Sequence, residues 1–360
     1  MGEKFHRLLA SLGLSQSSGW KRFSLLLIYG LALFYGAIFL VPVVPDSANT
    51  SIAEVYKVKI LPQSSLSSIA KQLSTQGIQS PPWLINTAGR ALFVGVKLKP
   101  GTYLLPLHGS LGNILQQIAR GDRVRERIAI IPGMSIWQLR QAIDSHPALI
   151  HQTKGLNSQE LLQLLNLSYP GAEGIFFPDT YTFDPDEPDI NIYRRAALAM
   201  QKQLNAAWIA RDPKSPLKTP YELLTLASIV EKETGRNQER GTVAGVFINR
   251  LNLNMLLQTD PTVIYGIGPQ FNGNLRKSDL RDNTPYNTYM RRGLTPTPIS
   301  MPSKESLRAS ALPAQTDAIY FVAKGDGSSH FSTNLKEHEN AVDRYQRKPA
   351  AAAKSKAATP

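Results

Sequence analysis

The sequence predicts an α+β protein built in three successive parts, and three observations predict it. An uncharged apolar run occupies residues 23–44, a strand–turn–helix pattern repeats between residues 58 and 143, and a helix-rich region with long polar and aromatic loops extends to about residue 346. With 360 residues, of which 42% are hydrophobic and 19% charged, the chain is long enough for two or three folded modules. Short strands that alternate irregularly with helices are typical of α+β modules, and we expect a mixed α/β domain in the last part.

The first element is a predicted transmembrane helix. Residues 23–44 carry no charge, and 22 residues are enough for a helix to span a bilayer. Basic residues precede the run: Lys4, Arg7, Lys21 and Arg22. The positive-inside rule then places residues 1–22 in the cytoplasm and the chain after about residue 45 outside. A cleaved signal peptide is the alternative, but its apolar region is usually shorter and no clear small-x-small site follows here. We expect an uncleaved single-pass anchor in the cytoplasmic (inner) membrane, with the N-terminus inside.

Composition excludes several kinds of site and partner. The chain has no cysteine, so thiol catalysis, zinc–thiolate sites and disulfides are excluded. The net charge of +13 could indicate nucleic acid, but the basic residues are spread along the chain and no RNP, zinc-finger or P-loop pattern is present. A membrane surface or an anionic polymer fits the charge equally well. No HExxH or similar ligand set surrounds His330 and His338, so we expect structural or substrate-contacting histidines, no metal and no cofactor.

The second part contains a repeated pattern. Residues 58–73 and 128–143 share a Pro, a Ser and three apolar positions at the same offsets, and a looser copy runs from Pro106 to Ile118. Each copy reads as an apolar strand, a Pro-containing turn, a Ser suited to N-capping, and a helix with apolar residues at i, i+3 and i+7. We expect residues 50–127 to form a small α+β subdomain that guides a substrate.

The third part is predicted to be mainly helical, with one long loop region. We expect helices at 195–208, 223–235 and 240–253, a buried strand at 318–323, and a turn and strand leading to a last helix after residue 325. Residues 254–302 show little periodicity and are rich in Gly, Pro, Asn and Thr, which predicts a structured and functional loop. The tail at 347–360 is low in complexity, and we expect it to be disordered.

Residues 223–235 (LLTLASIVEKETG) carry two carboxylates into the last turn of a buried helix. At about 100° per residue, Glu231 and Glu233 lie roughly 160° apart, so at most one can face a cleft and the other is a surface or capping group. A helix C-terminus and apolar neighbours both raise the pKa of a carboxyl group, as a general acid requires. The wheel does not choose between the two, and an ordinary amphipathic helix with a solvated end is the alternative.

Polar and aromatic runs flank this helix. They are EGIFFPDTYTF at 173–183, QTDPTVIYG at 258–266 and PYNTY at 285–289. Rings that stack on sugar faces and polar groups that bind hydroxyls are typical of a carbohydrate cleft, although each run alone also suits a turn. The candidate cleft residues are Glu173, Asp179, Gln258, Asp260, Tyr286, Asn287 and Tyr289.

The runs SIVEKETG, FINRL, LQTDPTVIYG, PYNTY and HFSTNLKEH occur in this order after an EGxFxPDTY run and a single N-terminal anchor. Over residues 50–345 the chain resembles the endolytic murein transglycosylases of the MltG/YceG family. The resemblance implies a LysM-like subdomain at 50–127 and a catalytic domain at 128–346. It also implies cleavage of the β-1,4 bond between N-acetylmuramic acid (MurNAc) and N-acetylglucosamine (GlcNAc) in nascent peptidoglycan. This reaction leaves 1,6-anhydroMurNAc ends and stops strand elongation beside peptidoglycan synthases (penicillin-binding proteins).

The resemblance also assigns the single catalytic acid/base to Glu233, the second carboxylate of the Glu-Lys-Glu run. Two other functions remain open: a non-catalytic glycan-binding scaffold that recruits synthases, and a hydrolase in which Asp179 or Asp260 assists Glu233. A penicillin-binding type of Ser nucleophile is excluded, because Ser228 and Lys232 are four residues apart and that motif needs three.

Overall fold

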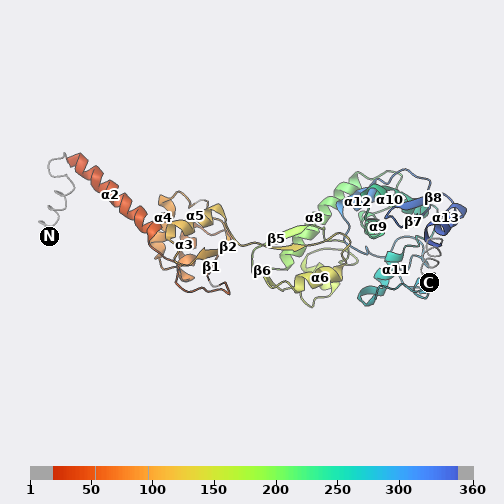
Figure 1. Cartoon of the computed structure of the whole chain (residues 1–360), viewed down its shortest axis with the longest axis horizontal. Helices are drawn as coiled ribbons and strands as arrows, with labels where there is room; N and C mark the ends of the chain where they lie inside the picture. Colours follow the sequence, from red (N-terminus) through yellow and green to blue (C-terminus); the bar gives the residue numbers. More distant parts are fainter. Residues whose placement is uncertain (1–18, 53, 96, 348–360) are drawn as a thin grey trace, which may run out of the picture. The chain divides into compact units, whose positions relative to one another are not determined.

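The computed structural model describes residues 19–52, 54–95 and 97–347 (Figure 1). Most of the predicted cytoplasmic segment (1–22) and nearly all of the predicted disordered tail (347–360) lie outside the described residues. The chain divides into two compact units, Met1–Glu126 and Arg127–Pro360. The mixed α+β class predicted from the sequence is confirmed by the elements of both units.

The first described element is the helix α2 (Gly19–Leu40). Its segment Phe23–Leu40 is long and apolar enough to cross a membrane by length and composition. The sequence predicted that the apolar span would reach residue 44, but the helix ends at Leu40 because the residue before Pro42 is disfavoured in the helical conformation. Val43 and Val44 instead hydrogen-bond to Gly109 O and are buried in the core of the first unit.

The remainder of the first unit is a two-stranded antiparallel sheet with three short helices. The strands β1 (Val55–Ile60) and β2 (Gly101–Pro106) pair from Val55↔Pro106 to Ile60↔Gly101. The helices are α3 (Leu66–Thr75), α4 (Pro82–Ala91) and α5 (Leu111–Arg120). Ser65 caps α3 as the repeat predicted, since its hydroxyl accepts a hydrogen bond from Ser68 N at 3.2 Å. Whether this unit is related to LysM modules stays a prediction.

The second unit combines three two-stranded sheets with helices of 7 to 20 residues. The strand pairs are β3 (Glu126–Ala129) with β5 (Thr180–Phe183), β4 (Leu149–Ile150) with β6 (Glu187–Pro188), and β7 (Tyr320–Ala323) with β8 (Ser329–Ser332). The helices are α6 (Ile136–Asp144), α7 (Ser158–Leu164), α8 (Ile190–Ile209), α9 (Pro220–Glu233), α10 (Asn237–Asn252), α11 (Asp260–Ile267), α12 (Lys304–Ala311) and α13 (Leu335–Val342). Single turns follow at Gly268–Gln270, Asp279–Arg281 and Asp343–Arg347.

Helix α9 lies at the centre of the second unit, in contact with α8, α10, α11 and α12 (Figure 1). Its start is fixed by Pro220 in the first turn and by Thr219, whose hydroxyl accepts a hydrogen bond from Glu222 N. All residues from 223 to 230 are buried. The helix ends where Thr234 turns to an extended conformation, so its last residue, Glu233, lies at the point where the helix leaves the core.

The long region from 254 to 302 differs in part from its prediction. It contains the eight-residue helix α11, which begins with Asp260 and Pro261 just after Thr259. A Thr before Asp-Pro is a recognised helix start, and the short length of the helix concealed its periodicity. The rest of the region consists of turns and short segments, and longer-range bonds such as that from Gln258 N to Thr288 O also hold it.

Candidate active site

A cavity of about 550 Å³ opens at the C-terminal end of α9. Its polar lining includes Glu233, Arg250, Gln258, Asp260, Tyr289 and His338. Strand β7 forms a further part of the wall. The cavity therefore gathers residues from several separate stretches of sequence around the last residue of one buried helix.

Glu233 lies in the wall of this cavity. Its Oε1 accepts a hydrogen bond from the hydroxyl of Thr259. Burial raises the pKa of Glu233 to about 7, and the negative charge of Asp260 adds to the rise, whereas the Thr259 hydrogen bond and the charge of Arg250 oppose it. A carboxyl group with a pKa near 7 can both donate and accept a proton at neutral pH, as an acid/base catalyst must.

The Thr259 hydroxyl is oriented by a small buried network. Thr259 occupies the N-cap position of α11, yet its side chain makes no capping bond and donates to Glu233 instead. Its backbone N donates to Thr288 Oγ1 at 3.1 Å, and its carbonyl accepts from Thr262 Oγ1 at 2.7 Å. All three threonines are at most 2% exposed, so the hydroxyl that touches Glu233 has little freedom to move.

Arg250 places a buried positive charge beside the same carboxylate. Its guanidinium donates to Ile319 O at 2.6 Å and to Leu257 O at 2.8 Å, and it lies 5.1 Å from the centre of the Tyr320 ring. These contacts join α10 to the segments before β7 and before α11. The guanidinium donates its hydrogen bonds to carbonyl oxygens. It therefore acts on Glu233 through its positive charge, which favours the ionised carboxylate.

Glu231 occupies a different environment, as the helical wheel predicted. Its side chain is 7% exposed and accepts hydrogen bonds from Ser303 N at 2.8 Å and Ser306 Oγ at 2.7 Å, and Arg240 lies 3.6 Å away. Ser303 is the N-cap of α12, so Glu231 satisfies the start of that helix. Only Glu233 of the pair lines the cavity.

The structure brings some of the predicted cleft residues to Glu233 and leaves others elsewhere. Gln258, Asp260 and Tyr289 line the cavity, and the Tyr289 hydroxyl donates to Asp260 Oδ1 at 2.6 Å. Tyr286 and Asn287 are not among the residues that line the cavity. The Tyr286 hydroxyl bonds the Thr297 hydroxyl, and the Asn287 amide, 1% exposed, donates to carbonyl oxygens of the same loop.

Glu173 and Asp179 are not among the residues that line the cavity. Glu173 is 2% exposed and accepts hydrogen bonds from Ile136 N at 2.8 Å and Gly174 N at 3.1 Å, which fixes the start of α6. Burial raises the pKa of Glu173 to about 7 as well. Asp179 is exposed, and its carbonyl accepts from Ile130 N beside the β3–β5 pair. A part for either residue in binding substrate stays a prediction.

Sequence reasoning missed Arg250 and β7 as parts of the site. Arg250 belongs to the FINRL run, where an Arg among apolar residues of a helix was the available signal. His338 was noted, and the structure places it in the cavity wall with its ring stacked on Tyr320 at 5.0 Å between centroids. Burial and the charge of Arg250 lower the pKa of His338. His330 is not among the residues that line this cavity.

Comparisons with known proteins bear on this geometry. The family model described as "YceG-like family" matches residues 58–344. The chain belongs to the YceG-like family. The family predicted from the sequence runs is thereby confirmed. A crystal structure of a yceG-like protein from Listeria monocytogenes aligns with this YceG-like chain at a TM-score of 0.51 and 28% identity, over 80% of this chain and 99% of that one.

Two named relatives belong to the same comparison. An endolytic murein transglycosylase of Bacillus subtilis (strain 168) is 32% identical over 345 residues, which cover 89% of the YceG-like chain and 91% of the relative. An endolytic murein transglycosylase of Streptococcus pneumoniae serotype 2 is 31% identical over 210 residues, 57% of this chain and 36% of that longer protein.

Proposed function

We propose that this chain is an endolytic murein transglycosylase, a lyase that cleaves the MurNAc-β-1,4-GlcNAc bond of nascent peptidoglycan strands and leaves 1,6-anhydroMurNAc ends. The observation that carries the proposal is Glu233, a carboxyl group with a pKa of about 7 at the wall of a polar cavity. The support for the substrate is family membership and the names of the relatives, which are enzymes that act on murein.

The reaction needs only one carboxyl group. Protonated Glu233 donates its proton to the glycosidic oxygen as the bond from that oxygen to C1 of the muramoyl residue breaks. The C6 hydroxyl of the same residue then attacks C1, and ionised Glu233 takes the hydroxyl proton. One C–O bond breaks, one forms inside the sugar, and Glu233 recovers its proton without any water being consumed.

The neighbours of Glu233 suit these two steps. The Thr259 hydroxyl donates to Oε1, which leaves the second carboxylate oxygen to exchange protons with the substrate. The charge of Arg250 favours the ionised form of Glu233, and the charge of Asp260 favours the protonated form. Because the two charges act in opposite directions, both forms of Glu233 are accessible near neutral pH. We assign Gln258, Asp260 and Tyr289 to contacts with sugar hydroxyl and acetamido groups.

The proposal extends to location and partners. Helix α2 would anchor the enzyme in the cytoplasmic membrane as a single-pass protein, with the catalytic domain outside, where penicillin-binding proteins polymerise new strands. The domain at 128–346 would carry the chemistry, and the LysM-like subdomain at 50–127 would guide the glycan. Termination of strand elongation follows if cleavage occurs beside the synthase.

A hydrolase is the second candidate, and Asp260 is the observation that favours it. Asp260 lines the same cavity, and its carboxylate could direct a water molecule to C1 in place of the C6 hydroxyl. The two reactions differ in their products, because hydrolysis adds one water to each new end and the lyase reaction adds none.

The test is a digest of purified peptidoglycan by the full-length protein in detergent, with mass spectrometry of the products. Anhydro ends are expected, and Glu233→Gln should lower the cleavage rate by about 10²–10⁴-fold, the usual contribution of a general acid. Glu231→Gln is the matched control on the same helix end and should keep cleavage. Ends that carry an added water would support the hydrolase, and no cleavage at all would support the scaffold. Full activity of Glu233→Gln with loss in Glu231→Gln would refute the assignment.

A further inference from the structure

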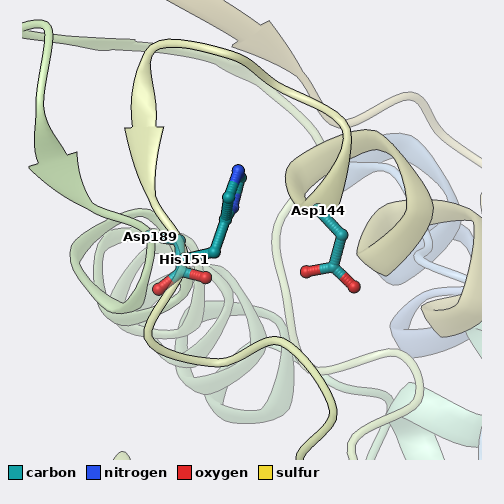
Figure 2. Close-up of side chains that lie close together, drawn as sticks. All are labelled: Asp144, His151 and Asp189. Atoms are coloured by element: carbon teal, nitrogen blue, oxygen red, sulfur yellow. The ribbon is translucent and has the colours of Figure 1, made fainter.

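A cluster of three side chains capable of binding a metal lies in the second unit, apart from the residues that line the Glu233 cavity (Figure 2). Asp144 is the last residue of α6, His151 follows β4, and Asp189 directly precedes α8. One potential ligand atom from each lies within 4.8 Å of the other two. In Figure 2 a carboxylate oxygen of Asp144 points toward Asp189 and His151. Three separate elements therefore present two carboxylates and an imidazole to one place.

Buried polar atoms without partners converge on this place. Asp144 Oδ1 and His151 Nδ1 are buried and have no hydrogen-bond partner within the described part of the chain. The fully buried Tyr193, four residues after Asp189 on α8, lies close by: its hydroxyl contacts the Thr153 side chain, and the charges of Arg140, Asp144 and Asp189 act on it. Buried polar atoms are nearly always bonded, so the two orphaned atoms of Asp144 and His151 indicate a ligand that they share.

The Asp189 carboxylate is already oriented as the ligand of a metal usually is. Asp189 is fully buried and accepts hydrogen bonds from Gln152 N at 3.1 Å, from Thr153 N at 3.1 Å and from the Thr153 hydroxyl at 2.7 Å. Oδ2 accepts both bonds from Thr153 and Oδ1 accepts the bond from Gln152, so a free lone pair remains on Oδ1. Hydrogen bonds of this kind hold ligating carboxylates in position around known metals.

The local charge also suits a cation. Arg140 is a positive group beside the cluster, and its guanidinium donates to the carbonyl oxygens of Thr153 and Leu156. The two carboxylates of Asp144 and Asp189 therefore face this one guanidinium, an excess of acidic groups in a partly buried setting. Such an excess is costly unless a positive ion accompanies it.

We propose that Asp144, His151 and Asp189 bind a divalent transition-metal ion, with Zn²⁺ as the first to test. An imidazole nitrogen with two carboxylates is a ligand set of zinc and manganese, whereas Ca²⁺ and Mg²⁺ prefer oxygen alone. Ligand atoms about 2.0–2.2 Å from a tetrahedral ion lie about 3.4 Å from each other, so side-chain movements of about 1.5 Å at most would close the site. A water molecule would complete the coordination, within reach of the Tyr193 hydroxyl. The ion would cross-link the end of α6, the loop after β4 and the start of α8.

The experiment is calorimetric titration of Zn²⁺ into the full-length, tag-free chain in detergent micelles after treatment with a chelator. We expect one Zn²⁺ per chain, and at least tenfold weaker binding in Asp144→Asn and in His151→Gln. These two residues are only partly buried, so their variants are expected to fold, whereas Asp189 also holds the loop backbone. His108→Gln is the matched control, an exposed histidine beside Asp46 in the first unit. Its affinity for Zn²⁺ should equal that of the unaltered chain.

A second measurement separates metal binding from misfolding. Without metal, both variants should show the circular dichroism spectrum of the unaltered chain. Added Zn²⁺ should raise the melting temperature of the second unit in the unaltered chain and in His108→Gln, but not in the two cluster variants. The proposal is overturned if the unaltered chain binds no stoichiometric Zn²⁺, or if Asp144→Asn and His151→Gln bind it as tightly as the control. Neither result depends on peptidoglycan cleavage.

Discussion

Replacement of Glu233 by Gln should stabilise the protein at pH 8 while it removes activity. The pKa of Glu233 is raised from 4.5 to about 7 in the folded chain, because burial disfavours the ionised form. The contribution of Glu233 to the free energy of unfolding is therefore fully present below about pH 4.5 and is lost as the pH rises through 7. At 1.36 kcal/mol per pKa unit, the rise in pKa from 4.5 to about 7 corresponds to a loss of about 3 kcal/mol at pH 8. Contact of the carboxylate with water in the cavity reduces this to about 2 kcal/mol.

The Glu233→Gln variant has no charge to bury, so it should melt about 4–8 °C higher than the unaltered chain at pH 8, given the size of the second unit. At pH 4 the two proteins should melt together. Near-ultraviolet circular dichroism of the full-length chain in micelles can follow this unit, because Trp137 stacks on Tyr265 within it at 4.8 Å between ring centroids. Glu173 has a similarly raised pKa but is present in both proteins, so its contribution cancels.

The matched control is Glu231→Gln, two residues earlier on the same helix. Glu231 is held by Ser303 and Ser306 and lies 3.6 Å from Arg240, so loss of its charge should lower the free energy of unfolding at pH 8 by about 1–3 kcal/mol. The two variants should thus change stability in opposite directions. The reasoning is refuted if Glu233→Gln gains no more at pH 8 than at pH 4, because its carboxylate is then well solvated.

Further outcomes follow from the same contacts. Thr259→Val removes a hydrogen bond to the ionised form of Glu233 and so raises the pKa of Glu233. The alkaline limb of the pH dependence of cleavage should then move up by about one pH unit, and an unmoved limb would contradict the assigned contact. Gly174 has φ +78°, and an added Cβ would lie 2.4 Å from Pro298 Cβ, so Gly174→Ala should lower the melting temperature by about 4–10 °C, and an unchanged value would exclude strain there. Arg250→Met leaves buried carbonyl oxygens without donors, so the free energy of unfolding measured with denaturant should fall by about 3 kcal/mol. A fall of less than about 1 kcal/mol would show that water takes the place of the guanidinium.

The sequence predicted those features of the site that depend on local periodicity. The 3.6-residue repeat was sufficient to separate Glu231 from Glu233 and to place a buried helix before them. The apolar run at the N-terminus predicted α2, although its last residues pack into the first unit because Pro42 ends the helix. Prolines within a hydrophobic stretch were the signal for this earlier end.

Features that depend on tertiary contacts could not be read in this way. The run at 173–183 mixes polar and aromatic residues much as the run at 258–266 does, yet only the second lines the cavity with Glu233. The first run leads into β5, whose pairing with β3 sets its position, while the second begins α11 against α9. Arg250 reaches the cavity because its guanidinium binds Ile319 O, a contact between residues 69 positions apart. Composition carries no information about such pairings.

The different environments of the two carboxylates follow from what surrounds the end of α9. The start of a helix favours a negative charge, and two helices begin there. Glu231 meets the start of α12, where it accepts hydrogen bonds from Ser303 and has Arg240 as a positive partner. Glu233 meets the start of α11, where the first helical residue, Asp260, already supplies a negative charge, so that burial raises the pKa of Glu233 with only partial compensation. If this account is correct, Asp260→Asn should lower the pKa of Glu233 and move the alkaline limb of cleavage down in pH. A limb that stays in place or moves up would show that burial alone sets the acidity of Glu233.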